Sequence, residues 1–345
     1  IAVMAATVTR AEAFTSRPPS PVEVTVGCYI NEIYDVDLPG NCFSVNAYVW
    51  FRWDPDAWPP PSLEELAMDA SQRGAVVPGA EALSDGAEPT GPNETFEVIR
   101  SRDIEVKEIY RRPGYCCVQI AGTVSNHWAV DDFPFDQQRF VLQIEDAVYE
   151  TSQIEYLADQ TLSNLAPDLE ISGCRVEGFV VAVRAYEYDT TFGDPDLAEG
   201  ARAQYSRFTA TVLTDRLGWQ LFLKLFTGLI VATVVAMLAF MIDPMQVDPR
   251  FGVCVGGLFG IIASSYVVQS LLPDGPNLSY SDRLHIAALI AVLAVLLEST
   301  ASLALKLAGD PKLDAKSRRL DRIGLAVVPA CFFGYMAYAT VQAVV

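Results

Sequence analysis

The stretch Phe133-Pro134-Phe135-Asp136-Gln137-Gln138 is the most informative part of the chain, because of its position ahead of a long apolar region. An aromatic–proline turn that ends in a carboxylate is typical of a surface loop on a β domain. Some eighty residues later, Arg216 stands at the edge of the first of four apolar segments. An arginine at such a boundary is a natural partner for the Asp136 carboxylate. Together these residues predict a β domain that pushes on a helical bundle.

Four apolar segments of 22 to 24 residues fill the rest of the sequence, at 221–242, 251–272, 284–307 and 323–345. Each segment is long enough to cross a hydrocarbon core of about 30 Å as a helix. The sequence therefore predicts a multi-pass protein of the cell membrane, with four helices in the lipid bilayer.

The basic residues set the expected orientation of these helices. The connection before the fourth segment carries six of them: Lys306, Lys312, Lys316, Arg318, Arg319 and Arg322. That connection is therefore expected in the cytoplasm, and it is too short for a separate domain. The connection 273–283 has one Arg and two Asp and is expected outside. The N-terminal domain is then extracellular or periplasmic.

Charged residues are unevenly distributed on the two sides of Arg216. The formal net charge is −19, yet the part after Arg216 holds only eight of the 43 acidic and nine of the 24 basic residues. The N-terminal part is thus strongly acidic and water-facing. Such a surface repels nucleic acid and favours cations, polyamines or protons as partners. The alternative is an acidic surface that serves solubility alone.

Short strands separated by turn signals predict the fold of the N-terminal part. Residues 22–34 and 42–53 alternate apolar and polar side chains around a turn at 35–40, which indicates a β-hairpin. Further strands are expected at 96–99, 104–110, 115–125, 138–144, 176–188 and 205–213. This pattern predicts an extracellular β-sandwich over 22–216, followed by a four-helix transmembrane domain over 217–345.

Two segments fall outside this pattern. Residues 1–21 are an N-terminal extension or a signal remnant, because an Ala-Glu-Ala run within them is like a signal-peptide cleavage site. Residues 59–92, rich in Pro, Ala, Gly and acidic side chains, are expected to be an insertion. A capping box predicts a short helix at 62–68 within it.

The sequence contains no P-loop, no GxSxG and no HExxH motif, and its only histidines are His127 and His285. We therefore expect neither an enzyme nor a bound cofactor. Five cysteines precede Arg216, so at least one of these thiols is unpaired or pairs between chains. No cysteine spacing indicates zinc.

Several motifs follow one another in a specific order. They are Gly-Cys-Tyr-Ile-Asn-Glu-Ile-Tyr-Asp-Val-Asp at 27–37, the strand at 45–54, Pro92-x-x-x-Phe96, the loop at 133–138, and Leu272-Pro273 followed by Tyr280. This series resembles the pentameric ligand-gated ion channels, the Cys-loop receptor superfamily. The two signature cysteines of that family fall at Asn126 and Phe140 here, so the family's disulfide is absent. With the missing intracellular domain, this places the chain beside the prokaryotic members.

The resemblance implies a homopentamer around a central pore that the second span lines. Counting back from Leu272-Pro273 places the helix start at Arg250, with Asp248 just before it. The implied pore face reads Asp248, Gly252, Gly256, Phe259, Ala263, Tyr266 and Ser270. The alternative for Gly252, Gly256 and Gly260 is close packing between helices.

Ion selection and gating follow from that face. Five Asp248 carboxylates would concentrate permeant cations at the inner mouth, and five Phe259 rings would form an apolar constriction. Arg250 is the competing argument, for anions, although it is expected to point toward the cytoplasm or a neighbouring helix. The first span departs from the family, since Leu223 and Gly228 stand where prolines are expected.

The resemblance also implies a region that couples the two domains: Asp37, Phe133, Pro134, Phe135, Asp136, Arg216 and Pro273. A half-buried cluster of an arginine and carboxylates can act as a two-state element. The alternative is a static salt bridge that holds the domains together. Glu298, an acid inside the third span, is a functional candidate, but its place near the inner end favours a snorkelling or hydrogen-bonded side chain.

An agonist site between subunits is the last implication of the resemblance. The matching residues are Tyr48, Glu145, Asp146, Tyr186, Tyr188, Phe192 and Tyr205. Tyrosines beside acids can hold a small cationic agonist through cation–π contacts, but Ala147 replaces the family's central Trp. Ordinary strand tyrosines are the alternative.

A ligand-gated, cation-conducting channel is the function that the sequence favours, with Ca²⁺ or protons as further ligands. A non-conducting membrane-anchored sensor on the same fold and an anion channel are the alternatives.

Overall fold

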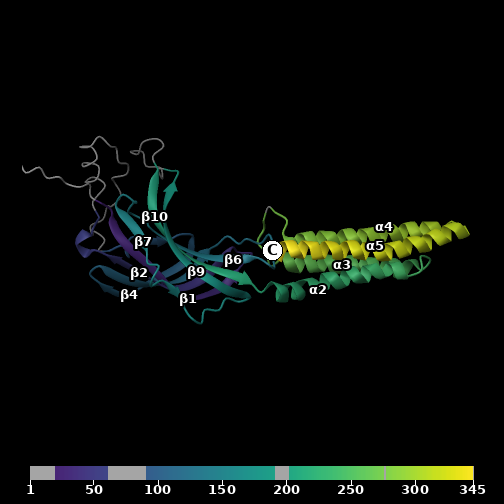
Figure 1. Cartoon of the computed structure of the whole chain (residues 1–345), viewed down its shortest axis with the longest axis horizontal. Helices are drawn as coiled ribbons and strands as arrows, with labels where there is room; N and C mark the ends of the chain where they lie inside the picture. Colours follow the sequence, from purple (N-terminus) through teal and green to yellow (C-terminus); the bar gives the residue numbers. More distant parts are fainter. Residues whose placement is uncertain (1–19, 61–90, 191–201, 276, 345) are drawn as a thin grey trace, which may run out of the picture.

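A computed structural model describes residues 20–60, 91–190, 202–275 and 277–344. The molecule is elongated, with a strand-rich part at one end and four helices at the other (Figure 1). We call these parts the β domain and the helical domain. The expected N-terminal extension, most of the insertion at 59–92, its short helix at 62–68, and Phe192 lie outside the described residues.

The β domain contains two sheets. The first has the order β4 (Ser101–Arg112), β5 (Tyr115–Ser125), β2 (Cys42–Trp53), β1 (Val22–Asp37) and β7 (Ile154–Ala158), and β8 (Asn164–Leu165) also pairs with β1. The second has the order β3 (Phe96–Val98), β6 (Gln137–Asp146), β10 (Ala203–Arg216) and β9 (Cys174–Tyr188). A short 3₁₀ helix, η1 (Pro55–Ala57), follows β2.

One apolar core lies between the two sheets. Alternate residues of the strands supply its side chains, because successive side chains of a strand point to opposite faces. Aromatic rings join the sheets across this core: Phe43 on β2 contacts Phe140 on β6, and Phe51 contacts Phe96 on β3, both with ring centroids 5.1 Å apart. The interior therefore fixes which face of each sheet points outward.

The predicted hairpin and the six further strands are present, with ends that differ by a few residues. Two short strands, β7 and β8, were not predicted from the sequence. Both pair in parallel with β1, so their partner lies more than a hundred residues away and no hairpin turn marks them. Both strands are short, and they form because they pair with β1, which is distant in sequence.

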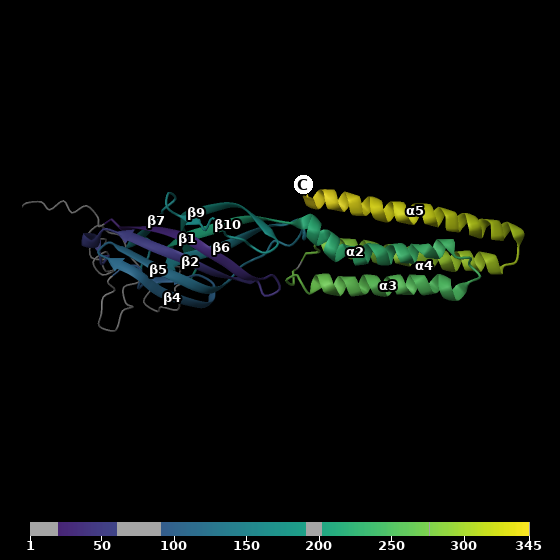
Figure 2. The ribbon, with the colours of Figure 1, turned by 90° about the horizontal axis from the view of Figure 1, so that it is seen from below.

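The helical domain consists of α2 (Gly218–Met237) with a 3₁₀ turn η2 (Leu238–Met241), α3 (Val247–Gln269), α4 (Tyr280–Leu307) and α5 (Pro311–Val344). All four helices are long and apolar enough to cross a membrane. Figure 2 shows α5 and α3 on opposite sides of the bundle. These findings indicate a multi-pass membrane protein.

Helix α5 begins at Pro311, twelve residues before the apolar segment 323–345. Most of the basic connection is therefore helical. Gly309 takes a left-handed conformation (φ +71°) after α4, and the Asp310 carboxylate accepts a hydrogen bond from the Lys312 amide (2.8 Å). A proline in the first helical turn loses no hydrogen bond, and the Asp314–Arg318 pair (2.7 Å) supports the next turn.

All seven cysteines, each within a described range, are free thiols. Where the resemblance places the missing disulfide, the Asn126 amide donates to the Arg139 carbonyl (2.8 Å), next to Phe140. The Phe140 ring meets Trp128 at 5.2 Å and is buried. A hydrogen bond and aromatic packing thus close this loop in the single chain.

Candidate functional site

The loop at 133–136, between β5 and β6, is the part of the β domain that packs against the helical domain. Arg216, the last residue of β10, forms a two-pronged ion pair with Asp136: Nε donates to Oδ1 at 2.8 Å and Nη2 to Oδ2 at 3.0 Å. Gln138 donates a further hydrogen bond to Asp136. The Arg216 and Asp136 side chains are only 10% and 3% exposed, and the guanidinium lies 5.3 Å from the Phe133 ring centroid. The pair is thus almost fully desolvated.

Phe135 connects the same loop to two helices. Its ring centroid lies 5.0 Å from that of Trp219 at the start of α2 and 5.8 Å from that of Tyr280 at the start of α4. A side chain at Gly218 would meet the Pro134 carbonyl at 2.7 Å, so the loop contacts the backbone of α2 directly. The Tyr280 amide donates to the Asp131 carbonyl (2.6 Å). A displacement of this loop would act on both helices.

Asp37 does not join this cluster in the single chain, contrary to expectation. Its carboxylate accepts a hydrogen bond from the Gly40 amide (2.9 Å) and closes its own hairpin turn, and the residue is exposed. Pro273 is half-buried in the loop between α3 and α4. The backbone hydrogen bond to the β domain comes from Tyr280, the first residue of α4.

All seven residues of the expected pore face are exposed, six of them on α3 and Ser270 at its C-terminal cap. Phe259 and Tyr266 are 65% and 69% exposed. The opposite face, which includes Arg250, Cys254 and Gly257, is buried against other helices. Helix α3 begins at Val247, so Asp248 lies in its first turn and not before the helix. The helix therefore presents the expected face as one continuous exposed surface.

The glycines of α3 fall into two groups. A side chain on Gly257 would meet the Ala232 carbonyl and the Ala236 methyl group, both at 2.7 Å, and one on Gly260 would meet Ala232 at 2.8 Å. These two glycines pack α3 against α2. Gly252 and Gly256 have open space where a side chain would lie. The packing alternative therefore holds for Gly260 and not, within the single chain, for Gly252 and Gly256.

Arg250 is fully buried and ties three helices together. Its Nη2 donates to Asp321 on α5 (2.6 Å) and to Glu298 on α4 (3.1 Å), and its Nη1 donates to the Ile242 carbonyl (2.9 Å). Glu298 is thus ion-paired, in accord with the expectation of a hydrogen-bonded side chain. Since the guanidinium is fully buried and paired with carboxylates, Arg250 adds no exposed positive charge to α3.

The expected tyrosine cage holds a cation of its own, Arg207 on β10. Its guanidinium carbon lies 3.5 Å from the Tyr186 ring centroid. Arg207 Nε donates to Glu145 Oε2 (2.7 Å) and Nη2 to the Tyr188 hydroxyl (2.8 Å), which donates to Glu145 Oε1 (2.5 Å). The cage that was expected to receive a free amine is therefore filled in the single chain.

The pKa values around this cage reflect its burial. Burial and the hydrogen bond to Glu145 raise the pKa of Tyr188 to about 12. Burial and the neighbouring Glu145 carboxylate raise the pKa of Glu97, which lies opposite Glu145 in the β3–β6 pairing. The row of paired positions across this sheet thus holds two carboxylates, Glu97 and Glu145, and two guanidiniums, Arg207 and Arg184.

Asp146 does not line the cage, contrary to expectation, and is 1% exposed. Its Oδ2 accepts from the Thr95 hydroxyl (2.6 Å), and its Oδ1 accepts from the amides of Val148 (2.9 Å) and Tyr149 (2.8 Å). Burial raises the pKa of this carboxyl above its ordinary value. The residue has a structural function, because it orders the loop that follows β6.

The remaining expected ligand residues are divided between the sheets. The Tyr205 ring lies 5.8 Å from that of Tyr188, so it belongs to the cage. Tyr48 is half-buried on β2, in the other sheet, and pairs with Tyr29 and Gln119 on the neighbouring strands. A site that uses Tyr48 and the cage together requires a second copy of the chain.

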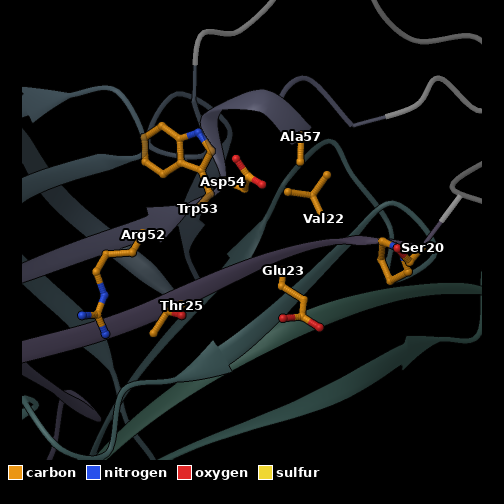
Figure 3. Close-up of a pocket in the computed structure, with 9 residues that line it drawn as sticks. Ser20, Val22, Glu23, Thr25, Arg52, Trp53, Asp54 and Ala57 are labelled. Atoms are coloured by element: carbon orange, nitrogen blue, oxygen red, sulfur yellow. The ribbon is translucent and has the colours of Figure 1, made fainter.

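The described residues also form a pocket of about 450 Å³ at the end of the β domain that lies away from the helices, between the start of β1 and the end of β2 (Figure 3). Glu23, Asp54 and Arg52 line it, and Arg52 is paired with Asp159 (2.6 Å). None of the pore, coupling or ligand residues expected from the sequence borders this pocket.

A scan against protein-family models finds no match for the chain, and a search of curated proteins finds no matching relative. The basis for a function is therefore the geometry of the chain.

Proposed function

We propose that the chain is one subunit of a homopentameric, ligand-gated channel of the pentameric ligand-gated type, which conducts cations through a pore lined by α3. The observation that carries this proposal is the exposed face of α3. That face runs without interruption from Asp248 in the first turn to Ser270 at the other end, while the opposite face packs against the bundle. A single four-helix subunit encloses no polar path, so conduction requires several copies.

Charge on α3 supports cations over anions. Asp248 is exposed at the N-terminal turn, whereas Arg250, two residues later, is buried and neutralised by Glu298 and Asp321. Five exposed carboxylates in a ring attract cations into the pore mouth. The arginine that argued for anions therefore has no part in ion selection.

The loop at 133–136, which we call the junction loop, supports a gating function for the β domain. It combines a desolvated ion pair with ring contacts to α2 and α4, and interfaces of this kind have discrete arrangements rather than a continuous range. A ligand that moves β6 or β10 would move Asp136 or Arg216 with it. We place the coupling step here.

The ligand that we propose is a small cation, Ca²⁺ or protons, recognised on the acidic outer surface between subunits. The cage alone is not a free amine site, because Arg207 fills it. Within the described ranges no group of three His, Cys, Asp or Glu side chains could hold a metal ion. We propose that a Ca²⁺ site combines carboxylates of two chains, for instance Glu97 of one chain with acids of the next.

A non-conducting sensor on the same fold is the second candidate. The observation in its favour is α2, an uninterrupted helix of 20 residues without the family's prolines. Native mass spectrometry and bilayer recording separate the two candidates. The channel proposal predicts a particle of five 37.7 kDa chains and currents that change with pH, Ca²⁺ or amines. A stable monomer, dimer or trimer, or a pentamer without current under every condition, would contradict it.

A further inference from the structure

The hydroxyl group of Thr95 lies between a buried acid and a backbone carbonyl in the β domain. Its Oγ1 is 2.6 Å from Asp146 Oδ2 and 3.4 Å from the Pro92 carbonyl oxygen. A hydroxyl has one proton, so it donates to only one of these two acceptors at a time. Thr95 and Asp146 are 5% and 1% exposed. The direction of the hydroxyl is therefore decided within the protein interior.

The two directions of this hydroxyl correspond to two charge states of Asp146. When the acid is ionised, Thr95 donates to Oδ2, while the amides of Val148 (2.9 Å) and Tyr149 (2.8 Å) donate to Oδ1. When Oδ2 has taken up a proton from water, the acid donates this proton to Thr95 Oγ1, and Thr95 turns its own proton toward the Pro92 carbonyl. Each of these polar groups keeps a partner in both arrangements, so neither state leaves a buried donor without an acceptor.

The surroundings of Asp146 favour the uptake of a proton. Burial raises the pKa of its carboxyl, although the hydrogen bonds from Thr95 and from two amides oppose this shift. The other ionisable groups around it are Glu97 on β3, Glu145 on β6, Tyr156 on β7, and Tyr205 and Arg207 on β10. Of these groups only Arg207 is a cation, and Glu145 holds it at 2.7 Å. The Asp146 charge is thus buried without a cation of its own.

We propose that Thr95 and Asp146 form a proton-binding site, in which the Thr95 hydroxyl reverses its direction as Asp146 takes up a proton. The Ala147 amide donates to the Thr95 carbonyl (2.8 Å), so the site joins the turn before β3 to the loop after β6. Proton uptake also removes a negative charge next to Glu145, which holds Arg207 in the tyrosine cage. This site deepens the proposed function, because it gives protons a binding place within one chain, and it rests on that function only where proton uptake is linked to gating.

The test is an infrared titration of the purified full-length protein, because the carbonyl stretch of a protonated carboxyl is separate from the bands of a carboxylate. The band that titrates in the wild type and is missing from Asp146→Asn belongs to Asp146. Thr95→Val removes the hydroxyl that stabilises the ionised acid. It should therefore move the titration midpoint of this band upward by about one pH unit, since one hydrogen bond to a charged group is lost. Thr95→Ser keeps the hydroxyl and should keep the wild-type midpoint.

Thr214→Val is the matched control. The Thr214 hydroxyl is also buried, but it donates to the Gln138 carbonyl (3.2 Å), so this variant should leave the midpoint unchanged. Thr95→Ala makes the same test if Thr95→Val does not fold. A shift in Thr95→Val that is no larger than in Thr214→Val would overturn the proposed reversal of the hydroxyl.

A spectrum of Asp146→Asn that lacks no titrating band would overturn the proton-binding site itself. Because the titration measures no current, its result is independent of whether the protein conducts ions. Failure of this proposal is therefore distinguishable from failure of the proposed function.

Discussion

Two buried arginines explain most of the chemistry of this chain at the scale of single residues. Arg207 fills the tyrosine cage of the β domain, and Arg250 ties three helices of the bundle together. Each is held by carboxylates that would be costly to bury alone. The tyrosine cage, which could have bound a ligand, is filled by Arg207. The Arg250 guanidinium, which could have attracted anions, is paired with carboxylates of the same chain.

Arg207→Met should destabilise the β domain by roughly 3–5 kcal/mol, because it leaves Glu145 buried without a cation. The matched variant is Arg207→Met with Glu145→Met, which removes both charges and should recover most of the loss. Chemical denaturation, monitored by tryptophan fluorescence, measures the free energy of unfolding of both variants. A double variant no more stable than the single one would show that charge compensation is not what Arg207 provides.

Asp146 gives the β domain a pH dependence of defined sign. Burial raises the pKa of its carboxyl above the ordinary 3.8. In the window between that value and the raised one, the folded chain holds a proton that the unfolded chain has released, so stability from this group falls as the pH rises. Asp146→Asn removes this dependence and keeps an oxygen for the Val148 and Tyr149 amides.

The unfolding midpoint of Asp146→Asn relative to the wild type should therefore improve as the pH is raised from about 3.8 toward neutrality. Midpoints measured at several pH values across that range provide the test. If the midpoint of Asp146→Asn relative to the wild type stays constant or falls as the pH rises, the raised pKa of Asp146 is contradicted.

Sequence reasoning at this scale found the Asp136–Arg216 pair and missed Arg207. The first pair was predicted because a carboxylate loop and a boundary arginine stand out in sequence. Arg207 was overlooked among the tyrosines, although alternation along β10 places it on the same face as Tyr205, which was chosen. Its partner Glu145 was also chosen, so the signal was present.

At the scale of elements, the junction loop at 133–136 is the link between strands and helices. Asp136→Ala and Arg216→Ala should each leave a folded pentamer whose response is weak or absent. Loss of one partner costs roughly 3–5 kcal/mol, which is enough to shift a two-state equilibrium strongly. Currents evoked by pH, Ca²⁺ or amines measure the response.

Arg283→Ala is the control for this junction. Arg283 lies 3.8 Å from Asp132, with side chains 40% and 51% exposed, and exposed pairs contribute at most about 1 kcal/mol. The currents of Arg283→Ala should therefore stay near those of the wild type. Normal gating in Asp136→Ala and Arg216→Ala would remove the pair from the mechanism, and loss of assembly would support the static bridge.

The adjacent glycines of α3 test which face packs against the bundle. Gly257→Ala introduces a methyl group 2.7 Å from Ala232 and Ala236 and should destabilise the bundle by about 1–3 kcal/mol. Gly256→Ala places the same group in open space and should be neutral or slightly stabilising, since Ala favours helix. Thermal unfolding in detergent compares the two. Equal effects would contradict the orientation of α3.

The strands and helices themselves were largely predictable, because alternation and apolar length are local signals. Their exceptions have physical causes. Strand β7 depends on a parallel partner in β1, and the early start of α5 depends on caps and ion pairs outside the apolar run. Packing of Gly257 against α2 could not be read from a glycine-rich helix alone.

At the scale of the whole molecule, the β domain lies at one end of the helical bundle (Figure 1). The sequence up to Arg216 is strongly acidic, and the sequence after it is nearly neutral. Phe259, 65% exposed on α3, lies 11 residues from Asp248, or about 16 Å along the helix. A constriction and a charged mouth can therefore be changed separately. Phe259→Ser should wet the constriction and raise the resting current, with little change in ion preference. A silent, correctly assembled Phe259→Ser pentamer would place the gate elsewhere, for instance at Tyr266.

The reversal potential of currents through the reconstituted protein in a salt gradient tests the central claim most directly. The wild type should reverse near the cation equilibrium potential. Asp248→Asn, which in the proposed pentamer would remove five exposed carboxylates from the pore mouth, should move the reversal potential toward zero while gating stays nearly intact. Reversal near the anion equilibrium potential in the wild type, or an unchanged value in Asp248→Asn, would contradict a cation pore lined by this face of α3.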